Sequence, residues 1–173
     1  LDHYVKIAAV LTEDVDISDS AEVFGAIASR CDLKPGSGLE ILKKVFSQWL
    51  DPSSPEAGLS SKMMADATGP SQHDPRPVTE TDVKNVSGSA KVTRASFPLS
   101  NNRDLCVVQV KPETHDLKEV FASAQDKPRL TILVDDDVDI EDFRQVLWAL
   151  ATRFQPAEDI VSLDGGLMLD ARK

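Results

Sequence analysis

Two acidic stretches hold the residues of this chain whose type and spacing could do chemistry. The longer one, "VDDDVDIED" at 134–142, lies between an apolar run and an apolar helical pattern. Adjacent carboxylates suit hard cations such as Mg²⁺, so Asp135, Asp136 and Asp137 are the candidate metal ligands. The other interpretation is a loop that joins a buried strand to a helix, with Asp142 capping the first helical turn. Capping explains the three earlier aspartates less well.

The pattern occurs twice, which predicts an internal repeat. Residues 6–30 align with residues 129–153 at a constant offset of 123 without a gap, and nine of 25 positions are identical. The identities are Asp14/Asp137, Val15/Val138, Asp16/Asp139, Ile17/Ile140, Asp19/Asp142, Val23/Val146, Ala26/Ala149, Ala28/Ala151 and Arg30/Arg153. In each copy an apolar β-branched run precedes the acids and an i, i+3, i+4 apolar pattern follows them. This order is typical of a buried strand and a helix packed on a sheet.

Composition and charge argue against several classes of protein. A net charge of -10 and the lack of a basic stripe disfavour nucleic acid or an anionic membrane as the main partner. The apolar runs are too short to span a bilayer and the start lacks a signal-peptide pattern, so we expect a cytoplasmic protein. Cys31 and Cys106 have no metal-ligand spacing. His3, His73 and His115 each stand apart from other ligand types.

The other segments predict an α/β fold. Residues 105–110, 130–134 and 159–163 are predicted strands, and residues 115–125 and 141–153 are predicted helices. This β-α-β-α-β order favours a parallel or mixed sheet with βαβ units, and the repeat predicts two related lobes.

The boundary between the lobes is predicted from composition. Residues 69–88 are rich in Pro, Ser and charge, and are interpreted as a linker or mobile loop between lobes at 1–68 and 89–173. In the first lobe, "LEIL" fits either a strand or the start of the helix "LEILKKVFSQWL", and propensity does not decide between them.

Three segments carry a resemblance to a known family. "LTILVDDDVDIEDFRQVLWALATRFQPAEDIV", "WLDPSSPEAGLSSKMMADAT" and "CVVQVKPE" resemble motifs of the C-terminal domain of the UbiD-type carboxy-lyases, the prenylated-flavin-dependent decarboxylases. The resemblance is limited to that domain and takes the form of two partial copies. It implies an α/β module that builds the oligomer and packs against a catalytic domain. That other domain is implied to hold prenylated FMN, manganese and the Arg with two acidic residues that transfer protons.

The catalytic set of the family has no match in this sequence. We therefore predict no catalytic residues, no cofactor-binding residues and no metal ligands here, and a chain that is not active alone. The prediction is an accessory or oligomerisation subunit of an aromatic-acid (de)carboxylase complex, whose partner is a second copy or a catalytic carboxy-lyase subunit. The candidate interface residues are Trp148, Arg153, Trp49, Lys62 and Met63.

Two alternatives remain at this stage. "LTILVDDDVDIEDFRQVL" also resembles the start of a phospho-acceptor receiver domain, in which adjacent aspartates bind magnesium. Only 36 residues follow Asp137, too few for the rest of a receiver. The other alternative is that the chain is a fragment of a complete carboxy-lyase. The substrate, the partner and the oligomeric state are not encoded in recognisable motifs.

Overall fold

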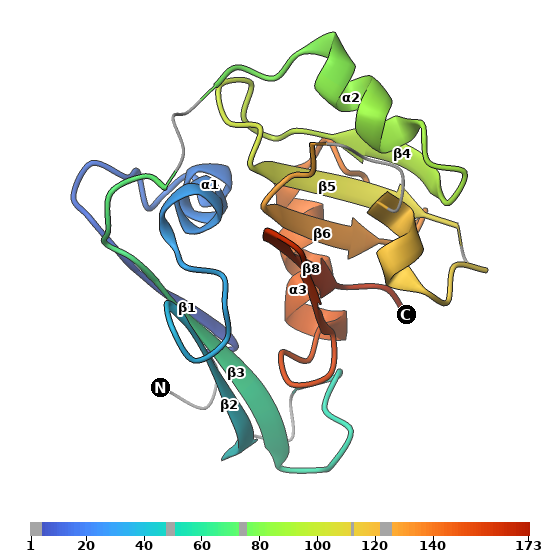
Figure 1. The fold of residues 1–173 in the computed structure, drawn as a ribbon. Coiled ribbons are helices and arrows are strands. Elements are labelled where there is room, and N and C mark those ends of the chain that lie inside the picture. The colour runs from blue at the N-terminus through green and yellow to red at the C-terminus, as the bar shows by residue number, and fades with distance from the viewer. Residues whose placement is uncertain (1–4, 48–50, 73–75, 112, 122–125) are drawn as a thin grey trace.

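The computed structural model describes residues 5–47, 51–72, 76–111, 113–121 and 126–173 (Figure 1). Its elements, in chain order, are β1 (Ile7–Leu11), α1 (Ser20–Arg30), β2 (Leu39–Phe46), β3 (Leu59–Ala67), α2 (Glu80–Ser87), β4 (Val92–Ser96), β5 (Leu105–Val110), the 3-10 helix η1 (Leu117–Phe121), β6 (Leu130–Val134), α3 (Phe143–Arg153), β7 (Ile160–Leu163) and β8 (Gly166–Asp170). Within these described ranges, no helix is long and apolar enough to cross a membrane.

The described strands form two mixed sheets. In the first, with the order β1-β3-β2, β3 runs parallel to β1 and antiparallel to β2. In the second, with the order β4-β5-β6-β8-β7, the three central strands are parallel and both edge strands are antiparallel. The α/β class with a mixed sheet is therefore confirmed, and a purely parallel sheet is wrong. One antiparallel pair arises because Gly165, at φ +77°, turns the chain in a tight hairpin between β7 and β8.

The strand, acid loop and helix of the predicted repeat have the same bounds in both copies. β6 and α3 begin and end 123 residues after β1 and α1. The strand order also corresponds, because β1-β3-β2 matches β6-β8-β7 with the same strand directions. The second sheet adds β4 and β5, and α2 and η1 have no counterpart among the described elements of the first lobe. Two related lobes thus stay a prediction beyond these shared elements.

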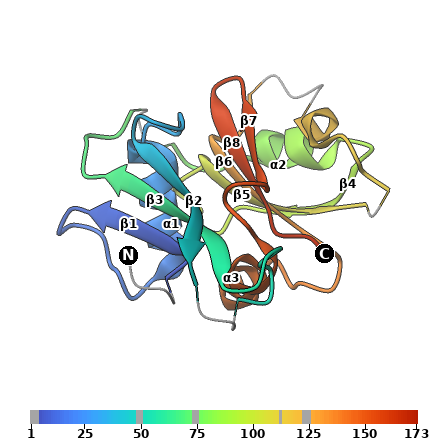
Figure 2. The same cartoon turned by 90° about the horizontal axis from the view of Figure 1, so that it is seen from below.

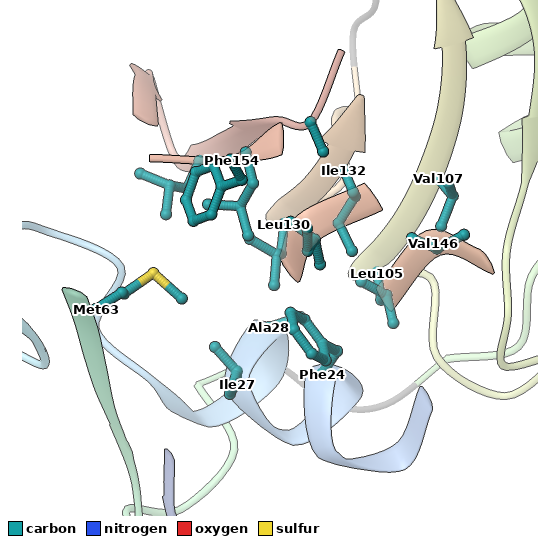
Figure 3. Close-up of a cluster of buried hydrophobic side chains, with 14 of the residues drawn as sticks. Phe24, Ile27, Ala28, Met63, Leu105, Val107, Leu130, Ile132, Val146 and Phe154 are labelled. Atoms are coloured by element: carbon teal, nitrogen blue, oxygen red, sulfur yellow. The ribbon is translucent and has the colours of Figure 1, made fainter. Parts of the chain in front are cut away.

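The main core lies where α1 is held between the two sheets (Figures 1 and 2). Ile27 and Ala28 of α1 lie between Met63 of β3 and Leu130 of β6 (Figure 3). β5 and β6 are buried on both faces, as expected for central parallel strands. Their alternate residues face α1 and α3 on one side and η1 with α2 on the other, where Phe121 is fully buried.

The structure decides one open alternative and differs from the predictions in two other segments. The ambiguous segment that starts with "LEIL" is a strand, β2, and not a helix. The predicted helix at 115–125 is the short 3-10 helix η1 in the part that the structure describes. Residues 122–125 lie outside the described residues. The range 69–88 contains α2, which begins at a capping box between Thr79 and Asp82. The lobe boundaries themselves stay a prediction.

Candidate functional site

The second acid loop is closed by ion pairs to the end of its own helix. Asp137 accepts hydrogen bonds from both terminal nitrogens of Arg153, at 2.9 and 2.7 Å. Asp135 accepts one from the backbone N–H of Lys173, at 2.7 Å. The hydrogen bonds from Arg153 and Lys173 hold the pKa of Asp137 far below its ordinary value. The side chain of Arg153 is only 6% exposed, so the pair fixes the loop against the helix.

The first acid loop is built in the same way. Asp14 pairs with Arg30, whose Nη1 lies 3.0 Å from Asp14 Oδ1, and the hydrogen bond from Arg30 lowers the pKa of Asp14. Asp19 accepts from the backbone N–H groups of α1, and Asp142 caps α3 equivalently. The acids therefore act as caps and loop-closing partners of a helix-end arginine, which answers the question that their spacing raised.

This donor set does not fit the metal or the cofactor that the family resemblance implies. Two carboxylates of the second loop, Asp135 and Asp137, already have cationic or N–H partners, and the loop arginines are engaged by carboxylates. Across the described residues, no group of three or more His, Cys, Asp or Glu side chains is placed to hold a metal ion. The helix-end arginines are therefore not free to hold a flavin phosphate, and the receiver interpretation gains no support.

We expect millimolar Mg²⁺, Mn²⁺ or Ca²⁺ to change the melting temperature by less than about 2 °C, because a ligand stabilises only by binding the native state preferentially. Differential scanning fluorimetry with each chloride salt, against NaCl of equal ionic strength, would measure this. A rise of more than about 5 °C that Asp136→Asn abolishes would instead establish a cation site at Asp135, Asp136 and Asp137.

The two repeat units are joined by reciprocal hydrogen bonds. Lys6 Nζ, before β1, donates to the carbonyl oxygen of Ala151 in α3, at 2.8 Å. Arg129, before β6, donates to the carbonyl oxygen of Ala28 in α1, at 2.6 Å. The two donors are 123 residues apart in the sequence, and so are the two acceptors. Each unit therefore caps the helix of the other through equivalent residues. Such exchange is what a twofold relation produces. Sequence reasoning missed it, although both cations occupy the same position in the aligned repeat.

A buried polar network reinforces this junction. Gln155 donates through Nε2 to Asp51 Oδ2 (3.1 Å) and Ser53 Oγ (2.9 Å), and its Oε1 accepts from the backbone N–H and the hydroxyl of Ser61. Asp51 also pairs with Lys6, at 2.9 Å. Burial by itself would raise the pKa of Asp51, but hydrogen bonds from Ser53 and Lys6 outweigh burial and lower it. Residues 51–53 and the segment after α3 thus meet in space.

The structure places the candidate interface residues at different depths. Trp148 is 53% exposed on the outer side of α3, with the guanidinium carbon of Arg153 at 4.8 Å from its ring centroid. Lys62 and Met63 of β3 are buried, and Lys62 Nζ donates to the carbonyl oxygen of Val5 at 2.6 Å. Trp49 lies outside the described residues. Of the candidates that the structure describes, only Trp148 presents a large side chain at the surface.

The paired strand, acid loop and helix units belong to an α/β domain with two mixed sheets. The family model of the 3-octaprenyl-4-hydroxybenzoate carboxy-lyase C-terminal domain, UbiD_C, matches residues 2–67 and 81–172. The chain therefore belongs to this family.

Individual relatives match smaller parts. An uncharacterized protein of Archaeoglobus fulgidus is 49% identical over 35 residues, 20% of this chain and 7% of the relative. A solved structure of the UbiD-class enzyme HmfF from Pelotomaculum thermopropionicum in complex with FMN is 39% identical over 40% of this chain and 15% of that chain, with a TM-score of 0.34.

Another solved structure is the open form of the vanillic acid decarboxylase of Sedimentibacter hydroxybenzoicus. It is 16% identical in a match that covers 80% of this chain and 40% of that chain, with a TM-score of 0.42. The chain thus spans less than half of each of these three relatives.

Proposed function

We propose that this domain is a non-catalytic accessory or oligomerisation module of an aromatic-acid (de)carboxylase complex. The observation that carries the proposal is the exposed Trp148, which is held in place by Arg153 on the outer side of α3. Membership of the carboxy-lyase C-terminal family supports the enzyme class. The partner is a second copy or a catalytic carboxy-lyase polypeptide, and the same face would serve if the chain is a portion of a longer protein.

The surroundings of Trp148 give this face the character of a binding hot spot. Arg153 is fixed by Asp137 and lies over the indole ring, so the ring is positioned before any partner arrives. A preorganised aromatic side chain loses little conformational entropy on binding. Tryptophan and arginine are also enriched among the residues that contribute most to interfaces. The acid loop therefore serves assembly indirectly, because Asp137 holds the arginine that positions Trp148.

Prenylated FMN and manganese, in this proposal, are held by the partner or by another domain. The solved structure of an evolved dimeric form of HmfF contains prenylated FMN, and the match to this chain covers 40% of that protein. The proposal assigns the cofactor to the part of such an assembly that this chain does not supply. The described residues of this chain supply packing and ion pairs at the acid loops, and no proton-transfer step is assigned to them.

Trp148→Ala is expected to weaken assembly by about 30-fold or more in dissociation constant, because truncating a hot-spot aromatic costs about 2 kcal/mol. Lys84→Ala, at a highly exposed position of α2, is the control and should leave assembly unchanged. Light scattering after size exclusion would measure self-association, and titration with a copurifying carboxy-lyase would measure docking. Equal behaviour of both variants and the wild type in both assays would contradict the proposal.

A further inference from the structure

A cavity of about 540 Å³ lies between β1 and α1 on one side and α3 on the other, and the proposed assembly role makes no use of it. β1, α1 and α3 form its apolar walls, with Ala9, Val23, Ile27, Leu147, Leu150 and Ala151 among the lining residues. Figure 2 shows α3 close to β1 and β3 at this junction. Small-molecule sites commonly have volumes of about 300–1,000 Å³, are lined mainly by apolar side chains and occur between domains.

Ala9 lines this space with a small side chain in the first repeat unit. Ala9 of β1 pairs with Ala65 of β3, and the equivalent pair in the second unit is Ile132 with Leu169. Ile132 and Leu169 are both fully buried in the core. The same strand positions are therefore filled in one unit and left small in the other. At the position of Ala9, the second unit has the larger side chain of Ile132.

One end of the cavity is polar and cationic. Lys6 and Lys62 line it, together with one carboxylate, Asp51. Lys6 Nζ donates to Asp51 Oδ1 at 2.9 Å and to Ser53 Oγ at 2.6 Å. The Ser53 hydroxyl is itself hydrogen-bonded to Asp51, so a ligand oxygen could replace it at the ammonium while Ser53 keeps its other bonds. Two lysines against one aspartate favour a negatively charged group at this end, in a chain of net charge -10.

We propose that this cavity binds a small amphipathic carboxylate, with its apolar tail between α1 and α3 and its carboxylate at Lys6. The tail removes apolar surface from water against Leu147 and Leu150, and the head gains a charge-assisted hydrogen bond from the ammonium group. The site lies inside one chain, between its two strand, acid loop and helix units. Binding there does not depend on the partner that the proposed function requires.

Decanoate is the probe that tests this proposal on the full chain. Isothermal titration calorimetry should show saturable binding of one decanoate per chain, with decan-1-ol binding at least about tenfold more weakly and decylamine not at all. Ala151→Phe fills the cavity from an exposed position of α3 and should abolish the binding. Arg144→Phe adds the same side chain to the same helix outside the cavity and should leave the binding intact.

The outcomes separate the proposal from its alternatives. Absence of saturable decanoate binding, or equal loss of binding in both phenylalanine variants, would overturn it. Equal affinity for decan-1-ol and decanoate would overturn the carboxylate specificity and leave an apolar pocket. Because Trp148 lies outside the cavity lining, failure of the assembly experiment would leave this result unaffected, and the reverse also holds.

Discussion

Replacing Arg129 by methionine is expected to lower the free energy of unfolding by about 3 kcal/mol, since breaking a buried charged hydrogen-bond network leaves acceptors without partners. Arg129 is buried just before β6. It donates to the carbonyl oxygen of Ala28 in the last turn of α1, at 2.6 Å, and to that of the C-cap residue Cys31, at 3.1 Å. It also donates to Gln72 Oε1 at 2.9 Å. Methionine is a long side chain too, but it satisfies none of these oxygens.

The measurement is urea unfolding at neutral pH, with Arg144→Met as the control. Arg144 is 91% exposed, and a surface change of this kind costs no more than about 0.5 kcal/mol. Arg129→Lys should recover only part of the loss, because an ammonium group cannot span three acceptors as a planar guanidinium does. If Arg129→Met unfolds at the same urea concentration as the control, the capping of α1 by Arg129 contributes nothing to stability.

Local patterns were sufficient to predict the repeated units. Apolar runs, helix-capping aspartates and terminal arginines act over a few residues, and the structure places β1, α1, β6 and α3 where these patterns indicate. The linker range also contained a local pattern that predicts a helix start, because Thr79 and Asp82 have capping-box spacing at the N-terminus of α2.

Long-range pairing decided the segments that the sequence left open. β2 carries Lys43 and Lys44 in a bulge with Lys44 at φ +53°, and its strand conformation depends on antiparallel pairing with β3. β8 follows a tight turn after β7, but its pairing with β6 joins segments more than 30 residues apart in the chain. Such contacts cannot be read from propensity.

In the candidate site too, contacts between residues close in sequence could be predicted and contacts between distant residues could not. The pair Asp137 and Arg153 is separated by one loop and one helix, and both residues were singled out from their positions in the repeat. The bonds from Lys6 to Ala151 and from Gln155 to Asp51 join residues more than 100 positions apart. The cavity beside them is lined by β1, α1 and α3, which are also far apart in the chain.

Gln155→Glu is expected to destabilise the domain by about 3 kcal/mol at neutral pH, because a buried charge then lacks a compensating partner. Gln155 is 4% exposed, and its Nε2 donates to Asp51 Oδ2 at 3.1 Å. In the variant, a carboxylate oxygen would face that carboxylate. Like charge and burial would both raise the pKa of the introduced carboxyl group in the folded state above its unfolded value. Asp51 stays ionised because its own pKa is lowered.

The sign of the pH effect follows from this difference. A raised folded-state pKa means that the folded variant binds more protons than the unfolded chain, so its stability should rise as the pH falls from 7 towards the unfolded glutamate value of about 4.3. Once protonated, the introduced side chain can donate to Asp51 as glutamine does. Gln145→Glu, at an exposed position of α3, is the matched control and should show little change with pH. Thermal melts of both variants and the wild type across this range would measure the difference. A Gln155→Glu deficit that is the same at every pH would mean that Asp51 does not face a charge at position 155.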